Sequence, residues 1–174
     1  MSEKIQLATI NDLDQVWALR KKATAFLKSL EVDQWQFEDP TILDFKEDIQ
    51  KEELYVYKID DEIVGMFALK FGIEPTYDSI DGAWRYHEPY ATIHRLALSI
   101  EHQKKGIAYE MLAYAESVTK SKGITYMRID THEKNLNAQR VFTKIGYVYC
   151  GIITLFIKHG EKKRLAYDKK LERG

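Results

Sequence analysis

The sequence predicts an α/β domain with a mixed, mostly antiparallel central sheet and helices on both faces of the sheet. Two observations support this prediction. Apolar runs typical of strands alternate along the chain with segments whose apolar residues recur at helical spacing. No Gly-, Pro- or Ser-rich linker and no internal repeat interrupts these elements, so we expect one domain over residues 1–174. The predicted order is β-α-α-β-β-β-α-β-α-β-β, which would pack as a three-layer sandwich.

The N-terminal part supplies the first strand and the first two helices. Residues 4–8 alternate in polarity and predict a short strand. Asn11 has the character of an N-cap, and helical spacing of apolar residues continues from there to about Leu30. A second helix is expected from about residue 40 to residue 51, with Pro40 in its first turn.

A hairpin and a long loop follow. Residues 54–59 and 63–70 predict two strands joined by a tight turn at residues 60–62. Residues 71–90 show no clean period and contain Gly, Pro and five aromatic residues, which indicates a loop. Long loops in compact domains often carry function.

The second half begins with a strand over residues 91–98 and a polar turn over residues 99–105. Gly106 then opens a helix whose apolar face has the spacing i, i+4, i+8 and i+11, at Ile107, Met111, Ala115 and Val118. The remaining elements are expected to be a strand, a helix and two strands, over residues 124–130, 135–144, 147–156 and 165–171.

Composition excludes some functions and favours a compartment. The 26 basic and 27 acidic residues give almost no net charge, so a dedicated nucleic-acid binder is not expected. Cys150 is the single cysteine, which allows no intramolecular disulfide and suits a reducing compartment. The N-terminus lacks the apolar core of a signal peptide, and no apolar stretch is long enough to span a bilayer. We therefore expect a soluble cytoplasmic protein without a membrane partner.

The junction between the strand at 91–98 and the following helix favours an anion. The first N–H groups of a helix have no intrahelical partner and carry partial positive charge. Gly106 has no Cβ, so a phosphate can approach its backbone closely. Lys104 and Lys105 add positive charge. The alternative is that Gly106 is only a turn glycine and that both lysines are solvated.

Two motifs carry a resemblance to a known family. The order Gln-x-x-Gly-x-Ala over residues 103–108 resembles motif A of the GCN5-related N-acetyltransferases (GNAT). Residues 135–147 resemble motif B of the same superfamily, in which Asn135, Ala138, Val141, Lys144, Gly146 and Tyr147 are in register. The predicted element order is similar to this fold over nearly the whole chain.

The resemblance implies transfer of an acetyl group from acetyl-CoA to a primary amine of a small molecule, directly within a ternary complex and without a metal. It places the pantetheine along the backbone of Leu96, Ala97 and Leu98. It places the pyrophosphate on Gln103, Lys104, Lys105, Gly106, Ile107 and Ala108. It adds cofactor contacts from the motif B helix, at Asn135, Ala138, Lys144 and Phe142, the last beside the thioester.

His94 is the candidate general base, at a position where many relatives carry Glu. An alkyl amine with a pKa near 10.4 is mostly protonated at pH 7, and its deprotonation costs about 4–5 kcal/mol. Histidine titrates near neutral pH and suits this task. The alternative is a structural histidine. The backbone N–H of Leu98 is the candidate donor to the carbonyl oxygen, and Arg95, which alternates to the opposite face, is expected to be structural.

Phe142 departs from the family pattern. Many relatives carry a tyrosine there, which is thought to protonate the leaving thiolate, and phenylalanine cannot donate a proton. Tyr147, our candidate, or Tyr149 could replace it, although such tyrosines are more often core residues. Water could act instead, the thiolate could leave unprotonated, or catalysis could be weak or absent.

The acceptor site is expected in the first helices and in residues 71–90. These segments supply the candidate substrate residues Trp35, Tyr77, Trp84, Tyr86, Glu88 and Tyr90. An acidic, aromatic cleft would suit a small cationic amine or a polyamine through ion pairing and cation–π contact. The alternative is a solvated loop with one or two core aromatics.

Two other functions remain compatible with the sequence. One is a protein acetyltransferase that acts on an N-terminus or a lysine. The other is a non-catalytic module that binds acetyl-CoA, for which Phe142 is the best argument. Exposed edge strands near the C-terminus would also allow a homodimer.

Overall fold

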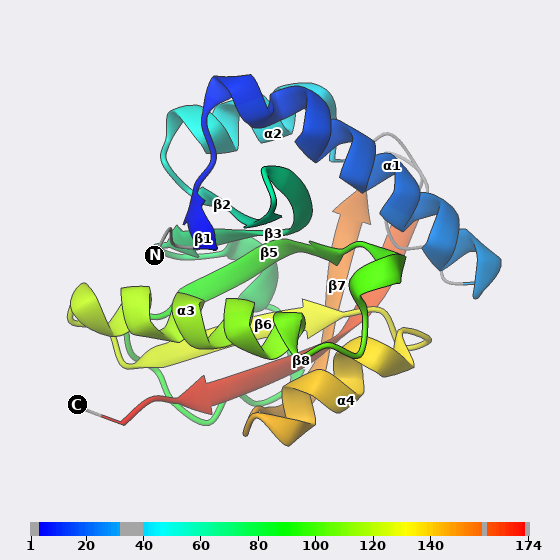
Figure 1. Ribbon diagram of the computed structural model, residues 1–174. Coiled ribbons are helices and arrows are strands. Elements are labelled where there is room, and N and C mark those ends of the chain that lie inside the picture. Colours follow the sequence, from blue (N-terminus) through cyan, green and yellow to red (C-terminus); the bar gives the residue numbers. More distant parts are fainter. Residues whose placement is uncertain (1–3, 32–39, 158–159, 173–174) are drawn as a thin grey trace. The chain divides into compact units, whose positions relative to one another are not determined.

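The computed structural model describes residues 4–31, 40–157 and 160–172 (Figure 1). The chain divides into two compact units. The first unit consists of residues 1–70 and 93–115, and the second consists of residues 71–92 and 116–174. The chain passes between the units three times, so no single linker separates them. One domain over residues 1–174 stays a prediction.

The first unit contains four neighbouring strands in the order β1-β2-β3-β5. They are β1 (Ile5–Leu7), β2 (Leu54–Ile59), β3 (Glu62–Phe71) and most of β5 (Ala91–Leu98). The β2–β3 hairpin turns at Asp60 and Asp61, which both have positive φ values, 49° and 66°. Two such residues match the twist of an antiparallel hairpin. The predicted hairpin is confirmed.

The two N-terminal helices begin at caps that differ from the predicted ones. Thr9 forms a capping box with Asp12, and a 3₁₀ turn (Ile10–Asp12) leads into α1 (Leu13–Ser29). The prediction of Asn11 as the N-cap is therefore wrong, because Thr9 has the acidic partner three residues on. Thr41 caps α2 (Ile42–Gln50) in the same way with Asp44, so Pro40 precedes the helix instead of lying in its first turn.

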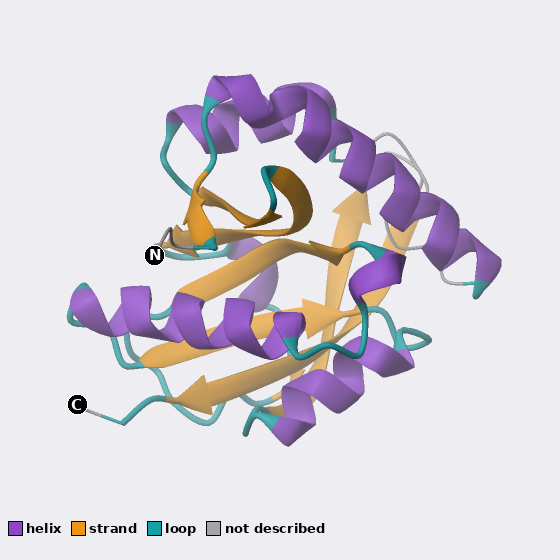
Figure 2. Cartoon of the chain, in the orientation of Figure 1, coloured by secondary structure: helices purple, strands orange, loops and turns teal. Residues whose placement is uncertain are grey.

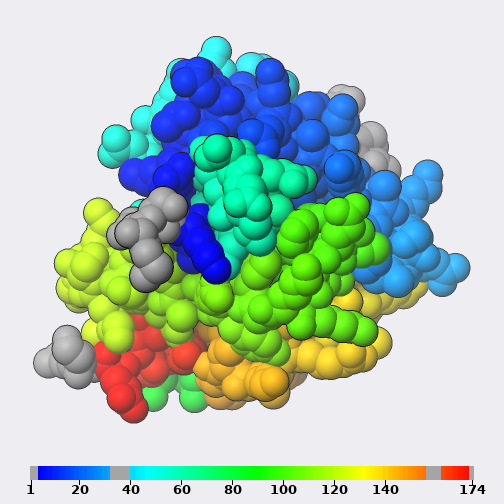
Figure 3. All heavy atoms as spheres, in the orientation of Figure 1, coloured from blue at the N-terminus to red at the C-terminus, as the bar shows by residue number. Residues whose placement is uncertain are grey.

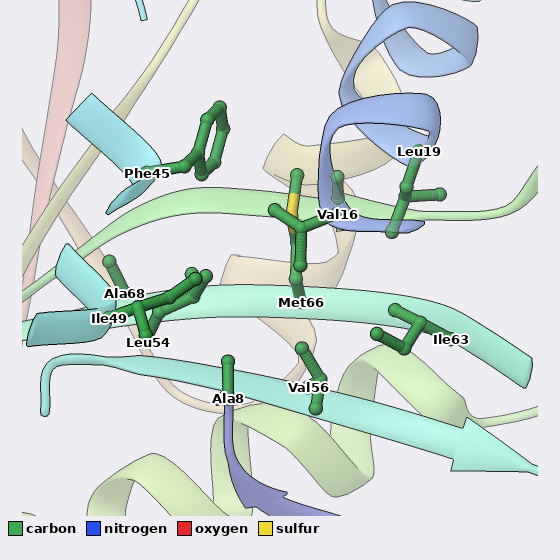
Figure 4. Packing of buried hydrophobic residues seen from close by; sticks show 11 residues of the cluster. Ala8, Val16, Leu19, Phe45, Ile49, Leu54, Val56, Ile63, Met66 and Ala68 are labelled. Carbon is green, nitrogen blue, oxygen red and sulfur yellow. The ribbon is translucent and has the colours of Figure 1, made fainter. Parts of the chain in front are cut away.

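Both faces of β3 are covered within the first unit. On one face, Val16 of α1 and Phe45 of α2 pack with Met66 of β3, and all three side chains are fully buried (Figure 4). On the other face, a Cβ added to Gly65 would lie 3.0 Å from the sulfur of Met111 in α3 (Ile107–Ser121). Two covered faces explain why residues 63–69 read as a continuous apolar run.

The second unit contains five neighbouring strands in the order β5-β6-β8-β7-β4. They are the start of β5, β6 (Tyr126–Thr131), β8 (Gly160–Lys170), β7 (Val148–Ile157) and β4 (Asp81–Gly82). Figure 2 draws the strands of the chain in orange. The start of β5 pairs with β6 in parallel through Ala91 and Thr92, whereas β6–β8, β8–β7 and β7–β4 are antiparallel. The mixed, mostly antiparallel sheet is thus confirmed.

The segment over residues 71–90 is mostly loop, as predicted, but it also contains β4 and a 3₁₀ turn (Pro75–Tyr77). A two-residue strand is too short to give a periodic signal. The last helix is α4 (Leu136–Lys144), which ends before Gly146 at φ +103°. No helix in the described ranges is both long enough and apolar enough to cross a membrane.

Candidate functional site

The turn after β5 has the backbone geometry of an open cradle. Ser99 is fixed to β3, because its N–H donates to the carbonyl of Val64 at 2.7 Å. Lys104 and Gly106 then adopt positive φ values of 66° and 80° before α3 begins. A Cβ added to Gly106 would meet no atom within 4 Å. Open space therefore lies in front of the backbone where the sequence predicts a bound phosphate.

The start of α3 supplies positive potential to this open space. The N–H of Glu110 donates to the carbonyl of Gly106 at 3.1 Å, which marks the first helical bond after the turn. The backbone N–H groups that precede this bond have no partner within the helix and carry the partial positive charge of the helix N-terminus. Lys104 and Lys105 are exposed, on a segment that lies at the surface (Figure 3, bright green). The turn fits a pyrophosphate.

The first turn of α3 is fastened to β2 by one hydrogen bond. The hydroxyl of Tyr57 donates to Oε2 of Glu110 at 2.5 Å. Tyr57 is buried, and this burial, together with the bond to Glu110, raises its pKa to about 12. The neutral phenol is therefore the form that holds the helix.

The strand β5 carries His94 and an unusual backbone conformation beside it. Arg95 has a φ of +57°, which costs about 1–2 kcal/mol in a residue with a Cβ. Its Nε donates to Oδ2 of Asp48 in α2 at 2.7 Å, which agrees with the structural role expected for Arg95. His94 is partly buried and interacts with neighbouring groups. Its role as the base stays a prediction.

The residues predicted to line the cofactor from β5 and the turn all lie in the first unit. Ala97 is buried in the core, whereas Leu96, Leu98 and Gln103 are partly exposed. Ile107 is buried in the first turn of α3, and Ala108 is partly exposed beside it. The fold thus places these motif A residues consecutively along one strand, one turn and one helix start.

Motif B begins with a helix cap in the second unit. Oδ1 of Asn135 accepts a hydrogen bond from the N–H of Ala138 at 3.2 Å, so Asn135 is the N-cap of α4. Lys144 lies in the last turn of α4, where its positive charge interacts favourably with the negative end of the helix dipole. Capping is one role that Asn135 fills. A cofactor contact from Asn135, Ala138 or Lys144 stays a prediction.

Phe142 and Tyr147 are both core residues. The ring of Phe142 is buried and packs against Tyr147 and Tyr167, at centroid distances of 5.9 and 5.7 Å. Tyr147 is also buried, its hydroxyl donates to the sulfur of Met127 at 3.5 Å, and burial raises its pKa. Its burial favours a structural role, and the role of Tyr147 as the acid stays a prediction. Tyr149, by contrast, is half exposed on β7.

Three predicted acceptor aromatics form the core of the second unit. Tyr77, Trp84 and Tyr90 are buried in one cluster. The indole N–H of Trp84 donates to the carbonyl of Tyr77 at 2.8 Å, and the hydroxyl of Tyr77 donates to Asp130 at 2.6 Å. The guanidinium of Arg128 lies 4.3 Å from the ring centroids of both Trp84 and Tyr90.

The cation that packs against Trp84 and Tyr90 is therefore Arg128, a residue of the protein itself. All three side chains are buried, one more than the alternative of a loop with one or two core aromatics expects, and this burial favours a structural role. Acceptor contacts from Tyr77, Trp84 and Tyr90 stay a prediction. Tyr86 keeps 37% of its surface exposed. Glu88 forms an ion pair with Lys170. Trp35 lies outside the described residues.

Sequence reasoning missed the buried charges that hold the loop at residues 71–90. Asp168 of β8 is fully buried and accepts hydrogen bonds from the backbone and side chain of Arg85 and from the hydroxyl of Tyr126. Arg128 of β6 donates to the carbonyl of Tyr86 at 2.9 Å. The sequence does contain a sign of these contacts: Arg128 and Asp168 are charged residues at inward positions of strands, and such residues are rarely buried without a partner.

Comparisons with known proteins agree with this geometry. The sequence matches the acetyltransferase (GNAT) family model over residues 16–147. A GNAT-family acetyltransferase structure from Streptococcus agalactiae is 34% identical, with a TM-score of 0.85 over 97% of this chain and 95% of that chain. An acetyltransferase structure from Staphylococcus aureus Mu50 is 31% identical, with a TM-score of 0.74 over 98% and 100%. The search of curated proteins gave no match.

A more distant structure shares the fold. The PaiA N-acetyltransferase from Thermoplasma acidophilum, determined with coenzyme A, is 20% identical, with a TM-score of 0.69 over 98% of this chain and 99% of that chain. The family match covers most of the chain and includes both β5 and the turn before α3. The chain belongs to the GNAT family and is an N-acetyltransferase.

Proposed function

We propose that the protein transfers the acetyl group of acetyl-CoA directly to a primary amine of a small molecule. The observation that carries the proposal is the turn before α3, where Gly106 faces open space at positive φ between exposed lysines and a helix start. This is the geometry that an anion with several phosphate oxygens needs. In the proposal the turn binds the pyrophosphate, through residues 103–108.

The backbone of β5 would hold the pantetheine arm, through Leu96, Ala97 and Leu98. Acetyl-CoA, when bound, supplies an activated thioester, so the chain needs no nucleophile of its own. The N–H of Leu98 is the proposed donor to the carbonyl oxygen. These roles use main-chain groups, which explains why apolar side chains are acceptable at all three positions.

His94 is the proposed base that takes the proton from the acceptor amine. The proton that returns to the CoA sulfur comes from solvent in this proposal, since Phe142 and Tyr147 are both core residues. For the acceptor, Tyr86 and Glu88 remain as proposed contacts. The three buried aromatics, Tyr77, Trp84 and Tyr90, become the framework that carries this loop.

Turnover with a panel of amines tests the proposal. The purified protein is incubated with acetyl-CoA and with monoamines, diamines, polyamines, a lysine-containing peptide or a peptide with a free N-terminus, and release of free thiol is measured. A reaction without amine controls for hydrolysis. Turnover with small amines is expected. Turnover with peptides alone would instead favour a protein acetyltransferase, and binding without any turnover would favour the non-catalytic module.

The role of His94 is tested by the pH profile of His94→Gln. If His94 is the base, kcat/KM for the amine falls by about 10²-fold or more. In the natural protein, kcat/KM should fall at low pH as the base becomes protonated, and this fall should be absent in His94→Gln. A histidine with only a structural role would leave that fall in place.

A further inference from the structure

Arg95 has a backbone conformation that strands do not normally contain. Six described non-glycine residues have positive φ, and five of them, Glu31, Glu52, Asp60, Asp61 and Lys104, lie in turns. Arg95, at +57°, lies inside β5. Such outliers persist only where the surrounding structure holds them, and they gather at functional sites.

The surrounding structure here is an ion pair from α2. Asp48 is 2% exposed, and its Oδ2 accepts from Nε of Arg95 at 2.7 Å. The guanidinium of Arg95 also lies 5.6 Å from the ring centroid of Phe45, three residues before Asp48 on the same helix. Two contacts therefore draw the Arg95 side chain onto α2.

Asp48 has a second cation on its other oxygen. Nζ of Lys70, at the end of β3, donates to Oδ1 of Asp48 at 2.8 Å and to Glu53 at 3.3 Å. A buried carboxylate needs such partners to stay charged. Lys70 and Arg95 bind different oxygens of Asp48. Replacement of Lys70 therefore removes one cation from Asp48 and leaves the bond to Arg95 of β5 in place.

The conformation of residue 95 sets the direction of its neighbours. Side chains and backbone groups of a strand alternate between two sides, and one residue in the left-handed region interrupts that alternation. His94 precedes Arg95, and the Leu96, Ala97 and Leu98 backbone follows it. Relaxation of residue 95 to an extended conformation would therefore re-aim both the proposed base and the proposed pantetheine strand.

We propose that Asp48 is a positioning residue, which holds β5 in its interrupted conformation through Arg95 and so aligns His94 with the backbone of residues 96–98. The inference rests on the proposed function for the role of those residues. It does not make Asp48 or Arg95 a catalytic residue, because neither is assigned a contact with a substrate.

Arg95→Ala and Arg95→Gly form a matched pair of tests. Both remove the ion pair, but only glycine adopts a φ of +57° without a Cβ penalty. In Arg95→Ala, KM for acetyl-CoA should rise and kcat should fall, each by about tenfold, because the site is misaligned. Arg95→Gly should recover activity to within about threefold of the natural protein.

Lys70→Met is the control for a merely structural role. It removes the other cation from Asp48 and should lower Tm, while KM and kcat stay unchanged. Asp48→Asn should resemble Arg95→Ala in its kinetics. The proposal would be overturned if Arg95→Gly were no more active than Arg95→Ala. It would also be overturned if Lys70→Met lost as much activity as Arg95→Ala.

A crystal structure of Arg95→Ala separates this inference from the proposed function. Residue 95 relaxing to an extended φ supports the role of the ion pair even if the natural protein fails to acetylate any amine. A positive φ that persists in Arg95→Ala overturns it, whatever the activity. Absence of acetyl-CoA binding by the natural protein would overturn the proposed function alone.

Discussion

The helices α3 and α4 both belong to motifs of the GNAT family, but they begin in different ways. At the start of α4, Asn135 places its own side-chain oxygen on the N–H of Ala138. At the start of α3, Lys104 and Gly106 turn the chain through positive φ, and open space lies in front of Gly106. A side-chain cap satisfies the helix from within, whereas an open turn offers its N–H groups to a ligand.

The largest expected difference comes from filling the open space. Gly106→Val places a β-branched side chain at a φ of +80° in front of the proposed pyrophosphate site. Acetyl-CoA binding, measured by calorimetry, should weaken by more than about 100-fold. Gly123→Val is the matched control, since Gly123 has a φ of +78°, equally open surroundings and a place at the other end of α3. Equal affinities for the two variants would show that the turn does not bind the cofactor.

A second difference concerns how α3 is held. The pKa of Tyr57 is raised by burial and by Glu110 to about 12, against about 10 in the unfolded chain. Below pH 10 the phenol is protonated in both states, and this stabilisation is fully present. Between pH 10 and pH 12 only the unfolded chain loses the proton, so the free energy of unfolding should fall, by about 2 kcal/mol from this residue.

Denaturant unfolding of Tyr57→Phe against the natural protein isolates that contribution. Burial also raises the pKa values of Tyr77 and Tyr126, but these residues are present in both proteins and their contribution cancels. The natural protein should lose more stability than Tyr57→Phe between pH 10 and pH 12. Parallel curves would mean that the pKa of Tyr57 is not raised in the folded protein.

The cap of α4 gives a smaller effect, on stability. Asn135→Ala removes the acceptor for the N–H of Ala138 and should lower the free energy of unfolding by about 1 kcal/mol. Asn135→Asp keeps a capping oxygen and should lose much less. Urea titrations of the two variants measure the difference, and an unchanged midpoint for Asn135→Ala would contradict the capping role.

The smallest effects should run in opposite directions at Lys104. Glycine at a φ of +66° avoids the Cβ penalty of about 1–2 kcal/mol but loses more backbone entropy on folding, so Lys104→Gly should raise the free energy of unfolding by about 0.5–1 kcal/mol. Loss of one exposed charge should weaken acetyl-CoA binding only about two- to threefold, and less at high salt. Glu52→Gly, at a φ of +56° in a remote turn, should show the gain in stability without the loss in affinity. An affinity loss in both variants would point to a general effect of the glycine.

Local patterns predicted much of the fold. The bounds of β2 and β5 match the predicted ranges to the residue, because apolar alternation and turn residues fix them locally. The cap before the first helical segment was missed because Thr9 and Asn11 are both good caps, and the position of Asp12 decides for Thr9, which caps the 3₁₀ turn that leads into α1.

The site was predicted less completely, because its side chains depend on distant partners. The positive φ of Arg95 goes with Asp48, 47 residues earlier in the chain, and no local pattern reports it. Trp84 was predicted to bind the acceptor, but its ring packs against Arg128, 44 residues later in the chain. The turn around Gly106, by contrast, depends on consecutive residues, and its sequence was sufficient to find it.

The interleaved course of the chain has a consequence for synthesis on the ribosome. The first unit receives β5 and the start of α3 from residues 93–115, after the chain has made an excursion through residues 71–92. Until residue 98 has left the exit tunnel, β3 lacks its neighbour β5 and presents an unpaired edge. The nascent chain is therefore exposed to wrong pairing during this interval, and chaperones that bind extended segments would be needed most at that length.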